Sequence, residues 1–366
     1  MRFAIAAGGT GGHLFPGLAV AEVLHAKGHE VMILTSEKHI DAVATEGRSE
    51  FKIERLPGIG MPRAISLDAV KFLFRFASAV KHCGMLLSKY QPRAVLGMGG
   101  FTSTAPILAA KLRGLPVFVH ESNAIPGKAN RLNSKLCGGM LVGFDALASR
   151  CSSTKCVVTG TPIRRALMSY PSKKNARDSF GLSPDSPTVL VMGGSQGASG
   201  INRAMVDGAI QLGARGGLSP QFIHLTGLKD EDTVREAYQK AGVRAWVGSF
   251  HHSMQDAYSA ADVAVARSGA ASLTELAFFK LPSILIPYPF AADDHQTRNA
   301  KIFSDAGAGF LLRESEADGG RLADEITRIL DRVVQQKMAD ACEKLNRIDA
   351  AERVAEVLLQ SVGLGG

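Results

Sequence analysis

The chain has 366 residues, 46% hydrophobic and 21% charged, a balance that excludes a disordered or fibrous protein. Single cores rarely grow beyond about 250–300 residues, so this length predicts two domains. The formal net charge of +8 favours a polyanion, an anionic substrate or a membrane surface as partner. The chain contains one Trp, five Tyr and no nucleic-acid-binding signature, so we expect no nucleic acid among its partners.

The apolar runs and the cysteines exclude further classes of protein. No apolar run approaches the roughly 20 residues needed to span a bilayer. The first expected strand begins at residue 3, which leaves no room for a signal peptide. The five cysteines lack a CxxC pair or the His spacing of a metal site, so we expect reduced thiols in a cytoplasmic protein.

In the first half, apolar runs alternate with helical patterns, which indicates βαβ units and a parallel sheet. Strands are predicted over 3–7, 30–35, 94–98, 116–120, 139–144 and 156–159. The first strand leads into Gly-Gly-Thr-Gly-Gly-His at 8–13. A glycine-rich turn between a buried strand and a helix offers backbone N–H groups to an anion.

Two more loops follow strands of the first half. They are Gly-Met-Gly-Gly-Phe-Thr-Ser at 97–103 and His-Glu-Ser-Asn-Ala-Ile-Pro-Gly at 120–127. Ligands of open α/β sheets bind at the carboxyl edge, so we expect both loops to lie beside the first glycine turn.

The two halves separate near 159–164, and a polar stretch at 170–178 follows. Further strands are predicted over 188–192, 221–226, 244–247, 262–266, 283–287 and 308–312, and the first leads into a second glycine turn at 193–198. This repetition predicts an α/β protein with two Rossmann-like domains, 1–162 and 163–341, whose parallel sheets face across a cleft. The last helix, from about 342 to 366, can pack back on the first domain or stay with the second.

Neither glycine turn matches a common nucleotide signature. A dinucleotide fingerprint beginning at Gly9 needs glycine where the chain has Leu14, and a P-loop needs Gly-Lys-Ser/Thr. A tight turn that binds nothing is the alternative for each, and the occurrence of two such turns weakens it.

The most specific stretch is Arg-Ser-Gly-Ala-Ala-Ser-Leu-Thr-Glu at 267–275, directly after a strand. Its small residues let a phosphorylated ligand lie against the backbone. Glu275, about one and a half turns into the helix, is placed to accept two hydrogen bonds from a ribose diol. The alternative is a glutamate that only complements the helix dipole.

Asp-Asp-His at 293–295 opens another helix. Asp residues before a helix commonly act as N-caps, so we expect no metal there. Gln296 and Asn299 are suited to hydrogen-bonding sugar hydroxyls.

These motifs occur in the order found in the MurG family of bacterial N-acetylglucosaminyltransferases, which the chain resembles from about residue 5 to 310. The resemblance implies a GT-B fold without a cofactor or bound metal. It implies a hexosyltransferase that transfers GlcNAc with inversion from UDP-GlcNAc to the 4-hydroxyl of MurNAc in undecaprenyl-pyrophosphoryl-MurNAc-pentapeptide (lipid I), giving lipid II for peptidoglycan. It also implies a peripheral place on the cytoplasmic face of the plasma (inner) membrane and contacts with proteins of cell-wall synthesis and division.

The resemblance assigns site residues by motif. UDP-GlcNAc is expected to meet Glu275 at the ribose, Ser195, Ser272 and Arg164 at the diphosphate, backbone near His251 at the uracil, and Ala270, Ala271 and Gln296 at the sugar. Thr10, Gly11, Gly12, His13 and Asn123 are expected to complete the site from the acceptor side. The chain departs from the family with Phe101 for Tyr, Thr104 for Gly and His251-His252 for an aliphatic–acidic pair.

The attacking sugar hydroxyl needs a proton acceptor. His13, at the lip of the first turn, has an unperturbed pKa near 6.5, which suits a general base. Glu121 is the competing base, and a structural or phosphate-contacting role is the alternative for His13.

Because the implied acceptor is a membrane lipid, we expect a docking surface. A helical spacing of three and four predicts a core stripe of Val70, Leu73, Ala77, Val80, Gly84 and Leu87. Phe72 then falls on the far side and Phe76 on the flank, beside Lys71 and Arg75, which suits an anionic membrane surface. The alternative is a helix buried on both sides.

Three other functions share parts of this pattern. Another GT-B transferase acting on a membrane lipid such as diacylglycerol would share the motifs of the second half, and a sugar-nucleotide epimerase is a more distant case. Outside enzymes, the chain would be a nucleotide-binding scaffold for cell-wall assembly.

Overall fold

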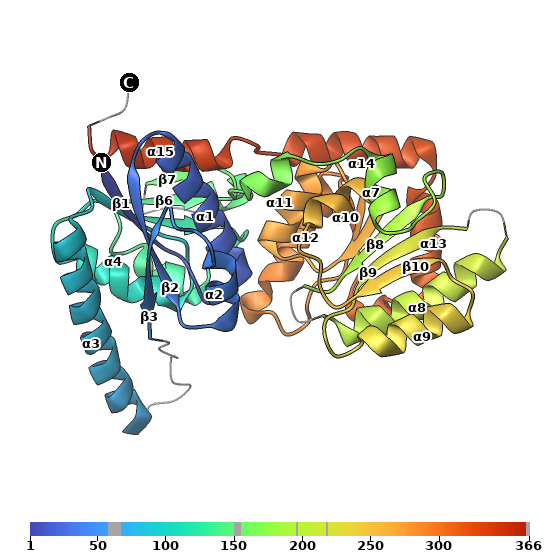
Figure 1. Cartoon of the computed structure of the whole chain (residues 1–366), viewed down its shortest axis with the longest axis horizontal. Helices are drawn as coiled ribbons and strands as arrows, with labels where there is room; N and C mark the ends of the chain where they lie inside the picture. Colours follow the sequence, from blue (N-terminus) through green and yellow to red (C-terminus); the bar gives the residue numbers. More distant parts are fainter. Residues whose placement is uncertain (58–66, 150–154, 195–196, 217–218, 364–366) are drawn as a thin grey trace. The chain divides into compact units, whose positions relative to one another are not determined.

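The computed structural model describes residues 1–57, 67–149, 155–194, 197–216 and 219–363. The chain forms two compact units (Figure 1). Unit 1 comprises Met1–Arg165 together with Arg347–Gly366, and unit 2 comprises Ala166–Asn346.

Unit 1 is built on a parallel sheet, which in the described residues has seven strands in the order β3-β2-β1-β4-β5-β6-β7. The strands are β1 (Arg2–Ala6), β2 (Glu30–Ser36), β3 (Lys52–Leu56), β4 (Ala94–Gly97), β5 (Val117–Glu121), β6 (Gly139–Val142) and β7 (Cys156–Val158). Ile5 of β1 pairs with Ile33 of β2 and Leu96 of β4. Strand β3 was not predicted, because its sequence mixes apolar residues with Lys52, Glu54 and Arg55 at the edge of the sheet.

Helices cover both faces of this sheet (Figure 1). Helices α1 (Gly11–Ala26) and α15 (Ala350–Gln360) share one apolar cluster with the strands, whereas α3 (Leu67–Tyr90) and α4 (Thr104–Lys111) share the other. Shorter helices are α2 (His39–Thr45), η1 (Phe101–Ser103), α5 (Lys128–Asn133) and α6 (Asp145–Ala148). The strands are apolar on both faces because both are covered.

Unit 2 repeats this plan around a second parallel sheet. Among the described residues it has six strands in the order β10-β9-β8-β11-β12-β13. They are β8 (Thr188–Met192), β9 (Gln221–Leu225), β10 (Ala245–Gly248), β11 (Val263–Ala266), β12 (Ser283–Leu285) and β13 (Gly309–Leu311). In both sheets the strand order reverses at the first strand of the unit, next to β4 in one and β11 in the other. This is the Rossmann-type switch point, and the predicted pair of Rossmann-like domains is confirmed.

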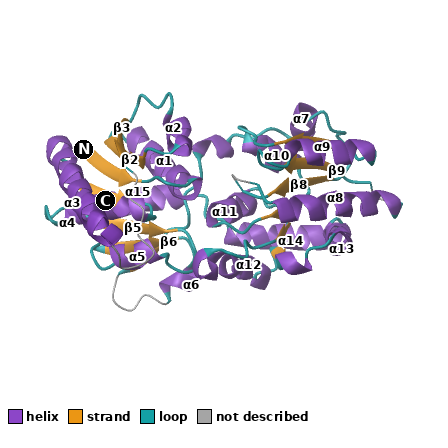
Figure 2. Ribbon diagram, turned by 90° about the horizontal axis from the view of Figure 1, so that it is seen from below, coloured by secondary structure: helices purple, strands orange, loops and turns teal. Residues whose placement is uncertain are grey.

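Figure 2 shows helices above and below each sheet. Those of the second half are η2 (Arg165–Met168), α7 (Lys173–Ser179), α8 (Ser199–Ala214), α9 (Glu231–Lys240), α10 (Met254–Ala260), α11 (Ala270–Phe278), η3 (Ala292–Asp294), α12 (His295–Asp305), η4 (Glu314–Glu316), α13 (Gly319–Ile329) and α14 (Arg332–Leu345). The core of unit 2 joins α8, α9 and α13 to the sheet, with Met205, Tyr238 and Ile326 fully buried.

The expected single C-terminal helix is two helices, α14 in unit 2 and α15 in unit 1. The extended backbone of Asn346 (φ −70°, ψ 132°) ends α14. Helix α15 then buries Val354 and Leu358 in the core of unit 1. Gly160, at φ +82°, leaves room for Arg347, the residue where the chain returns to unit 1. A Cβ on Gly160 would lie 2.5 Å from the Cβ of Arg347.

The thiols differ in part from expectation. Cys83, Cys137 and Cys342 are free, but Cys156 is disulfide-bonded, which corrects the prediction of reduced thiols at that position. Sequence spacing carries no information on which sulfurs the fold brings together. Within the described ranges, none of the helices is both long and apolar enough to cross a bilayer.

Candidate active site

Both glycine turns lie at the carboxyl ends of the switch-point strands, β1 and β8. Gly9 and Gly194 occupy matching places and share a φ of +89°, a left-handed conformation that favours glycine. In the helices that follow, the N-cap residues, Thr10 of α1 and Ala198 of α8, make no side-chain cap hydrogen bond with the described residues. Uncapped N–H groups at such an edge are available to an anionic ligand. Ser195, assigned to the diphosphate, lies outside the described residues.

A buried carboxylate holds the first turn in shape. Asp41 Oδ2 accepts hydrogen bonds from the backbone N–H groups of Gly9, at 2.8 Å, and Ser36, at 3.0 Å. Lys38 Nζ donates to the Gly9 carbonyl at 2.8 Å. The peptide groups of Gly9 are therefore used by the protein, and the turn is rigid before any ligand arrives. Nothing in the sequence marked Asp41, which lies beyond the next strand.

His13 is the third residue of α1 and is half-buried. Its Nδ1 lies 3.1 Å from Thr10 Oγ1, and its ring lies on Gly99 and Gly100. A Cβ on Gly99 would lie 3.2 Å from the ring, and one on Gly100 would lie 3.0 Å from it. The loop at 97–103 therefore lies beside the first turn, as predicted.

Glu121 and Asn123 belong to the next loop. Glu121 is only 3% exposed. Its Oε1 accepts from the backbone N–H and the side-chain amide of Asn123, and its Oε2 accepts from Gly127 N and Asn130 Nδ2, all at 2.9 Å. These bonds use the four acceptor positions of a carboxylate. The geometry favours a role for Glu121 in building the loop over one as proton acceptor.

His120 connects this loop to the end of the first domain. Its Nε2 donates to the carbonyl of Gly160 at 2.9 Å, and Ser122 Oγ lies 3.3 Å from its Nδ1. Complete burial lowers the pKa of His120, so the ring is neutral. A few residues on, the guanidinium of Arg164 lies 4.4 Å from the ring centre of Phe15, which places this cation against α1.

In unit 2, Ala270, Ala271 and Ser272 form the first turn of α11, after the extended N-cap Gly269. Glu275 follows in the second turn, where Tyr258 of α10 donates a hydrogen bond of 2.6 Å to its Oε2. No local sequence pattern pointed to this partner.

The start of α11 is tied to α12. Ser268 Oγ donates to the Gln296 carbonyl at 2.9 Å, and Asn299 Nδ2 donates to the Ser268 carbonyl at 3.1 Å. Gln296 Oε1 accepts from the Tyr288 N–H at 2.9 Å, which fixes the orientation of its amide. The predicted sugar-binding side chain Gln296 is therefore preorganised at the carboxyl edge, whereas Asn299 is buried in the scaffold.

The turn before α12 is strained. Asp293 and Asp294 both have φ of +53°, a left-handed conformation that non-glycine residues seldom adopt. Asp294 occupies the N-cap position, as predicted, but its side chain makes no cap hydrogen bond with the described residues. Within the part of the chain that is described, no group of three or more His, Cys, Asp or Glu side chains is arranged to hold a metal ion.

His251 precedes α10 and packs on two aromatic rings, Phe180 at 4.8 Å and Trp246 at 5.4 Å between centroids. Its Nε2 is buried and has no hydrogen-bond partner among the described residues. Burial lowers the pKa of His251, which favours the neutral ring. The neighbouring backbone is where the uracil was predicted.

An ion pair at the edge of unit 2 was not predicted from the sequence. Arg267 Nη1 lies 2.8 Å from Glu314 Oε2 and donates to the Pro287 carbonyl at 3.0 Å. An added Cβ on Gly200 would lie 2.1 Å from Glu314, so glycine in the first turn of α8 makes room for this carboxylate.

Helix α3 presents a different face from the one predicted. Leu73 is 62% exposed and Ala77 is also exposed, so the predicted core stripe is wrong at both positions. Phe72 and Phe76 are half-buried, stacked on each other at 6.0 Å and packed on Phe101. Val70 lies outside the residues with described side chains.

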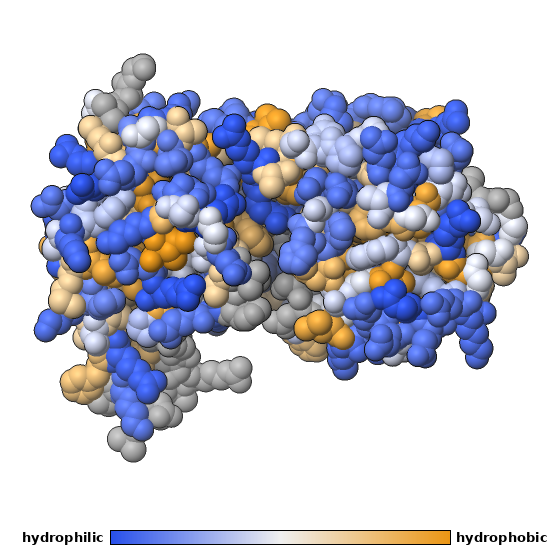
Figure 3. Space-filling model, viewed as in Figure 1, coloured by the Kyte–Doolittle hydropathy of each residue, from blue (hydrophilic) through white to orange (hydrophobic). Residues whose placement is uncertain are grey.

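The most exposed aromatic residue of this helix is Phe74, at 75%. Lys71 and Arg75 are exposed as well. Leu73, Phe74, Lys71 and Arg75 are called the α3 patch below. Figure 3 shows apolar and hydrophilic residues side by side along α3.

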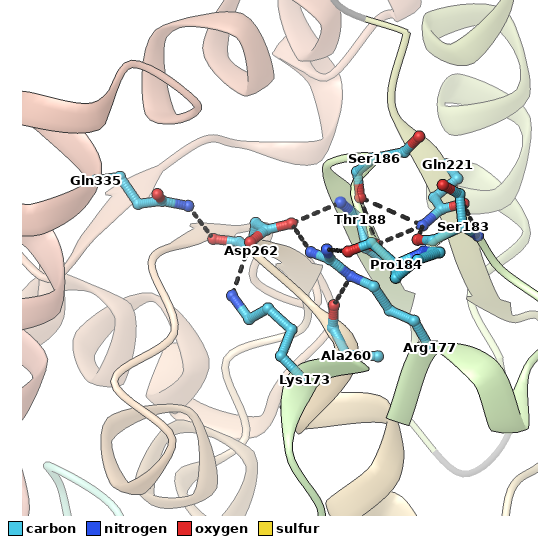
Figure 4. A network of polar contacts seen from close by, with 10 residues as sticks. All are labelled: Lys173, Arg177, Ser183, Pro184, Ser186, Thr188, Gln221, Ala260, Asp262 and Gln335. Carbon is cyan, nitrogen blue, oxygen red and sulfur yellow. Dashed lines mark hydrogen bonds and ion pairs between the residues drawn. The ribbon is translucent and has the colours of Figure 1, made fainter. Parts of the chain in front are cut away.

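The amino edge of the second sheet carries a separate polar network (Figure 4). Asp262, just before β11, pairs with Arg177 at 2.5 Å and Lys173 at 2.7 Å, and accepts from Thr188 N at 2.7 Å. Gln335 Nε2 donates to the Asp262 carbonyl at 3.0 Å. The network fastens α7 and α14 to the sheet. A cavity of about 410 Å³ adjoins it, lined in part by Lys173, Tyr258 and Phe279.

Comparison with known proteins identifies the family. The glycosyltransferase family 28 N-terminal domain matches residues 3–142, and the family 28 C-terminal domain matches residues 188–354. Two relatives carry the name UDP-N-acetylglucosamine–N-acetylmuramyl-(pentapeptide) pyrophosphoryl-undecaprenol N-acetylglucosamine transferase. The one from Geobacter sulfurreducens is 36% identical over 99% of both chains. The one from Myxococcus xanthus is 37% identical over 98% of this chain and 92% of the relative.

Among solved structures, MurG of Acinetobacter baumannii superposes with a TM-score of 0.78 at 26% identity, over 98% of this chain and 99% of that one. The predicted GT-B class, with two Rossmann-like domains, is thereby confirmed. The chain belongs to glycosyltransferase family 28 and, within it, to the MurG family.

Proposed function

We propose that the protein transfers GlcNAc from UDP-GlcNAc to the 4-hydroxyl of MurNAc in lipid I, giving lipid II. The observation that carries the proposal is the near full-length match to relatives named for this transfer. The described features at the carboxyl edges of both sheets agree with it: an uncapped glycine turn, an acidic residue in α11 and an oriented amide at the start of α12.

The proposed step is an inverting displacement. The acceptor hydroxyl loses its proton to a base, its oxygen bonds to the anomeric carbon, and the bond from that carbon to the diphosphate oxygen breaks. UDP leaves with the bonding electrons. The negative charge on UDP is stabilised by helix N-terminal N–H groups and Arg164 without a metal ion.

We assign the donor to unit 2. Glu275 binds the ribose hydroxyls, the backbone beside His251 binds the uracil, and Gln296 binds the sugar. The first turn of α11, which contains Ala270, Ala271 and Ser272, contacts the donor, and Ser195 is assigned to the diphosphate. The small residues of this turn allow a ligand to approach the α11 backbone closely.

We assign the acceptor to unit 1, where Thr10, Gly11 and Gly12 form the first glycine turn. His13 is the proposed base, because its ring is held by Thr10 and by two glycines while remaining partly exposed. Asn123 supports the acceptor side, and Glu121 holds Asn123 in place.

We also propose that the protein is peripheral, on the cytoplasmic face of the plasma membrane. The α3 patch supplies exposed apolar residues beside two cations, a combination that binds anionic lipid surfaces. Phe72 and Phe76 contribute less than predicted because they pack on Phe101. Contacts with proteins of cell-wall synthesis and division stay a prediction.

One assay tests the activity. Radiolabelled UDP-GlcNAc is offered together with lipid I in detergent, and label should move to the lipid and release UDP. Label that moves to diacylglycerol instead would identify another lipid transferase. Conversion of UDP-GlcNAc without acceptor would identify an epimerase, and binding without turnover would identify a scaffold. Loss of activity in EDTA that Mg²⁺ restores would contradict the metal-free mechanism.

A further inference from the structure

We propose that Tyr258 is a positioning residue for donor binding, and that it acts by orienting the carboxylate of Glu275. The inference rests on the proposed role of Glu275 in binding the ribose. It adds a residue from a second helix, α10, to the construction of the nucleotide site.

The contact is short and directional. The Tyr258 hydroxyl donates to Glu275 Oε2 at 2.6 Å, and it also lies 3.7 Å from the sulfur of Met192. A carboxylate is a much stronger acceptor than a thioether, so the proton points to Glu275. Met192 is the last residue of β8 and places the hydroxyl at the carboxyl end of the central strand.

The phenol ring is held as firmly as its hydroxyl. Tyr258 is only 3% exposed, and its ring stacks on Phe279 with centroids 5.0 Å apart and planes at 25°. Phe279 in turn packs edge-on against Tyr170 and Phe278. Stacking on Phe279 therefore opposes movement of the hydroxyl if the Glu275 side chain rotates, and the hydrogen bond favours one position for the carboxylate.

This contact matters because glutamate is flexible. A free glutamate side chain loses considerable rotamer entropy when it binds a ligand, and a carboxylate already held by a charge-assisted hydrogen bond loses less. Tyr258 also joins α10, which follows the predicted uracil-binding backbone, to α11, which carries Glu275. The hydroxyl therefore sets the spacing between the base and ribose contacts.

The test is a double-mutant cycle on UDP binding, measured by calorimetry with the full-length protein. Tyr258→Phe keeps the stacked ring and removes the hydroxyl, and we expect UDP to bind about tenfold more weakly. In the Glu275→Ala background the same change should have no further effect. At saturating UDP-GlcNAc, kcat of Tyr258→Phe should stay within about twofold while the donor KM rises, as expected for a lost binding contact.

Tyr170→Phe is the matched control. It removes a hydroxyl from the same aromatic cluster, where the described ring contacts of Tyr170 are with Phe278 and Phe279, and it should leave UDP affinity unchanged. Unchanged affinity in Tyr258→Phe, with weakened affinity in Glu275→Ala, would overturn the positioning role alone. If the losses of UDP affinity from the two substitutions multiply in the double variant, Tyr258 does not act through Glu275, and the positioning role is overturned. Unchanged affinity in Glu275→Ala would overturn the ribose assignment itself.

Discussion

Glu121 holds Asn123 through two hydrogen bonds of 2.9 Å, one from its backbone N–H and one from its side-chain amide. The same carboxylate accepts two more bonds on its other oxygen. A residue whose acceptor positions are all used by its own loop and by Asn130 of α5 is a poor proton acceptor for a substrate. The relationship leaves His13 as the better candidate for the base.

The first prediction therefore tests which of the two residues, His13 or Glu121, is the general base. His13→Ala should lower kcat by at least about a hundredfold, because general-base assistance contributes about 10²–10⁴ in rate, and donor KM should stay within a few-fold. The acidic limb of the pH–rate profile should disappear. Steady-state kinetics across pH checks this. A preserved kcat with a higher donor KM would instead make His13 a binding residue.

Glu121→Gln completes the comparison. Glutamine places an N–H₂ group where one carboxylate oxygen accepts two N–H donors, so the loop should loosen and unit 1 should unfold more easily. We expect thermal unfolding at a lower temperature, with kcat falling less than in His13→Ala. A stable variant with the larger loss of kcat would restore Glu121 as the base.

The second prediction concerns the ribose. Glu275→Ala removes charge-assisted hydrogen bonds worth on the order of 1.5–3 kcal/mol each, so UDP should bind at least about tenfold more weakly. Calorimetry on the folded variant measures this. Glu343→Ala, which removes an exposed carboxylate of the same unit, is the control and should bind UDP normally.

The third prediction uses the corrected orientation of α3. Leu73→Ser with Phe74→Ser should weaken binding to anionic vesicles, because the substitution removes exposed apolar surface beside two cations. Activity on a soluble, short-chain acceptor should persist. Cosedimentation with vesicles measures the first effect.

Phe72→Ser with Phe76→Ser is the informative comparison. These rings pack on Phe101, so the change should lower the stability of unit 1 and reduce activity on both kinds of acceptor. If this double variant is stable and has lost only vesicle binding, Phe72 and Phe76 are the membrane-contacting residues instead.

The fourth prediction is a pH dependence of stability in unit 2. Burial lowers the pKa of His224 to about 3, whereas the unfolded chain has an ordinary histidine near 6.5. The unfolded state therefore binds a proton that the folded state excludes between these values, and stability falls as pH drops below about 6.5. At pH 5 the expected loss is about 2 kcal/mol relative to pH 7.5.

Trp246 reports on unit 2 because it is the only tryptophan of the chain and lies in β10. Its fluorescence during urea unfolding should give a lower midpoint at pH 5 than at pH 7.5. His224→Gln should flatten this difference, since His224 contacts Asn202 and Tyr238 in the buried core. Equal wild-type midpoints at the two pH values would contradict the prediction.

Most strands could be predicted from the sequence because parallel strands covered on both faces are continuous apolar runs, as in Val263–Ala266. Edge strand β3 was not predicted because three of its five residues are charged, and two of these, Lys52 and Arg55, are exposed. Helix α3 was oriented wrongly because aromatic residues at 72, 74 and 76 fit several helical faces equally well. Only contact with Phe101 decides which of them is buried.

The site was predictable where short motifs fix the backbone, as in the glycine turns and the start of α11. It was not predictable where function depends on pairs distant in sequence. Asp41 supports Gly9, and Tyr258 supports Glu275, yet neither partner has a local pattern that distinguishes it from an ordinary core or surface residue. Hydrogen bonds of this kind can be identified only from the packed structure.

The place of α15 in unit 1 imposes an order on biosynthesis. Val354 and Leu358 of α15 belong to the same apolar cluster as α1. The whole of unit 2 lies between α1 and α15 in the sequence. The nascent chain therefore carries an uncovered apolar face on α1 while the ribosome completes unit 2. Unit 1 reaches its final packing only after residues 350–360 have left the ribosomal tunnel, so its last folding step follows translation of the other domain.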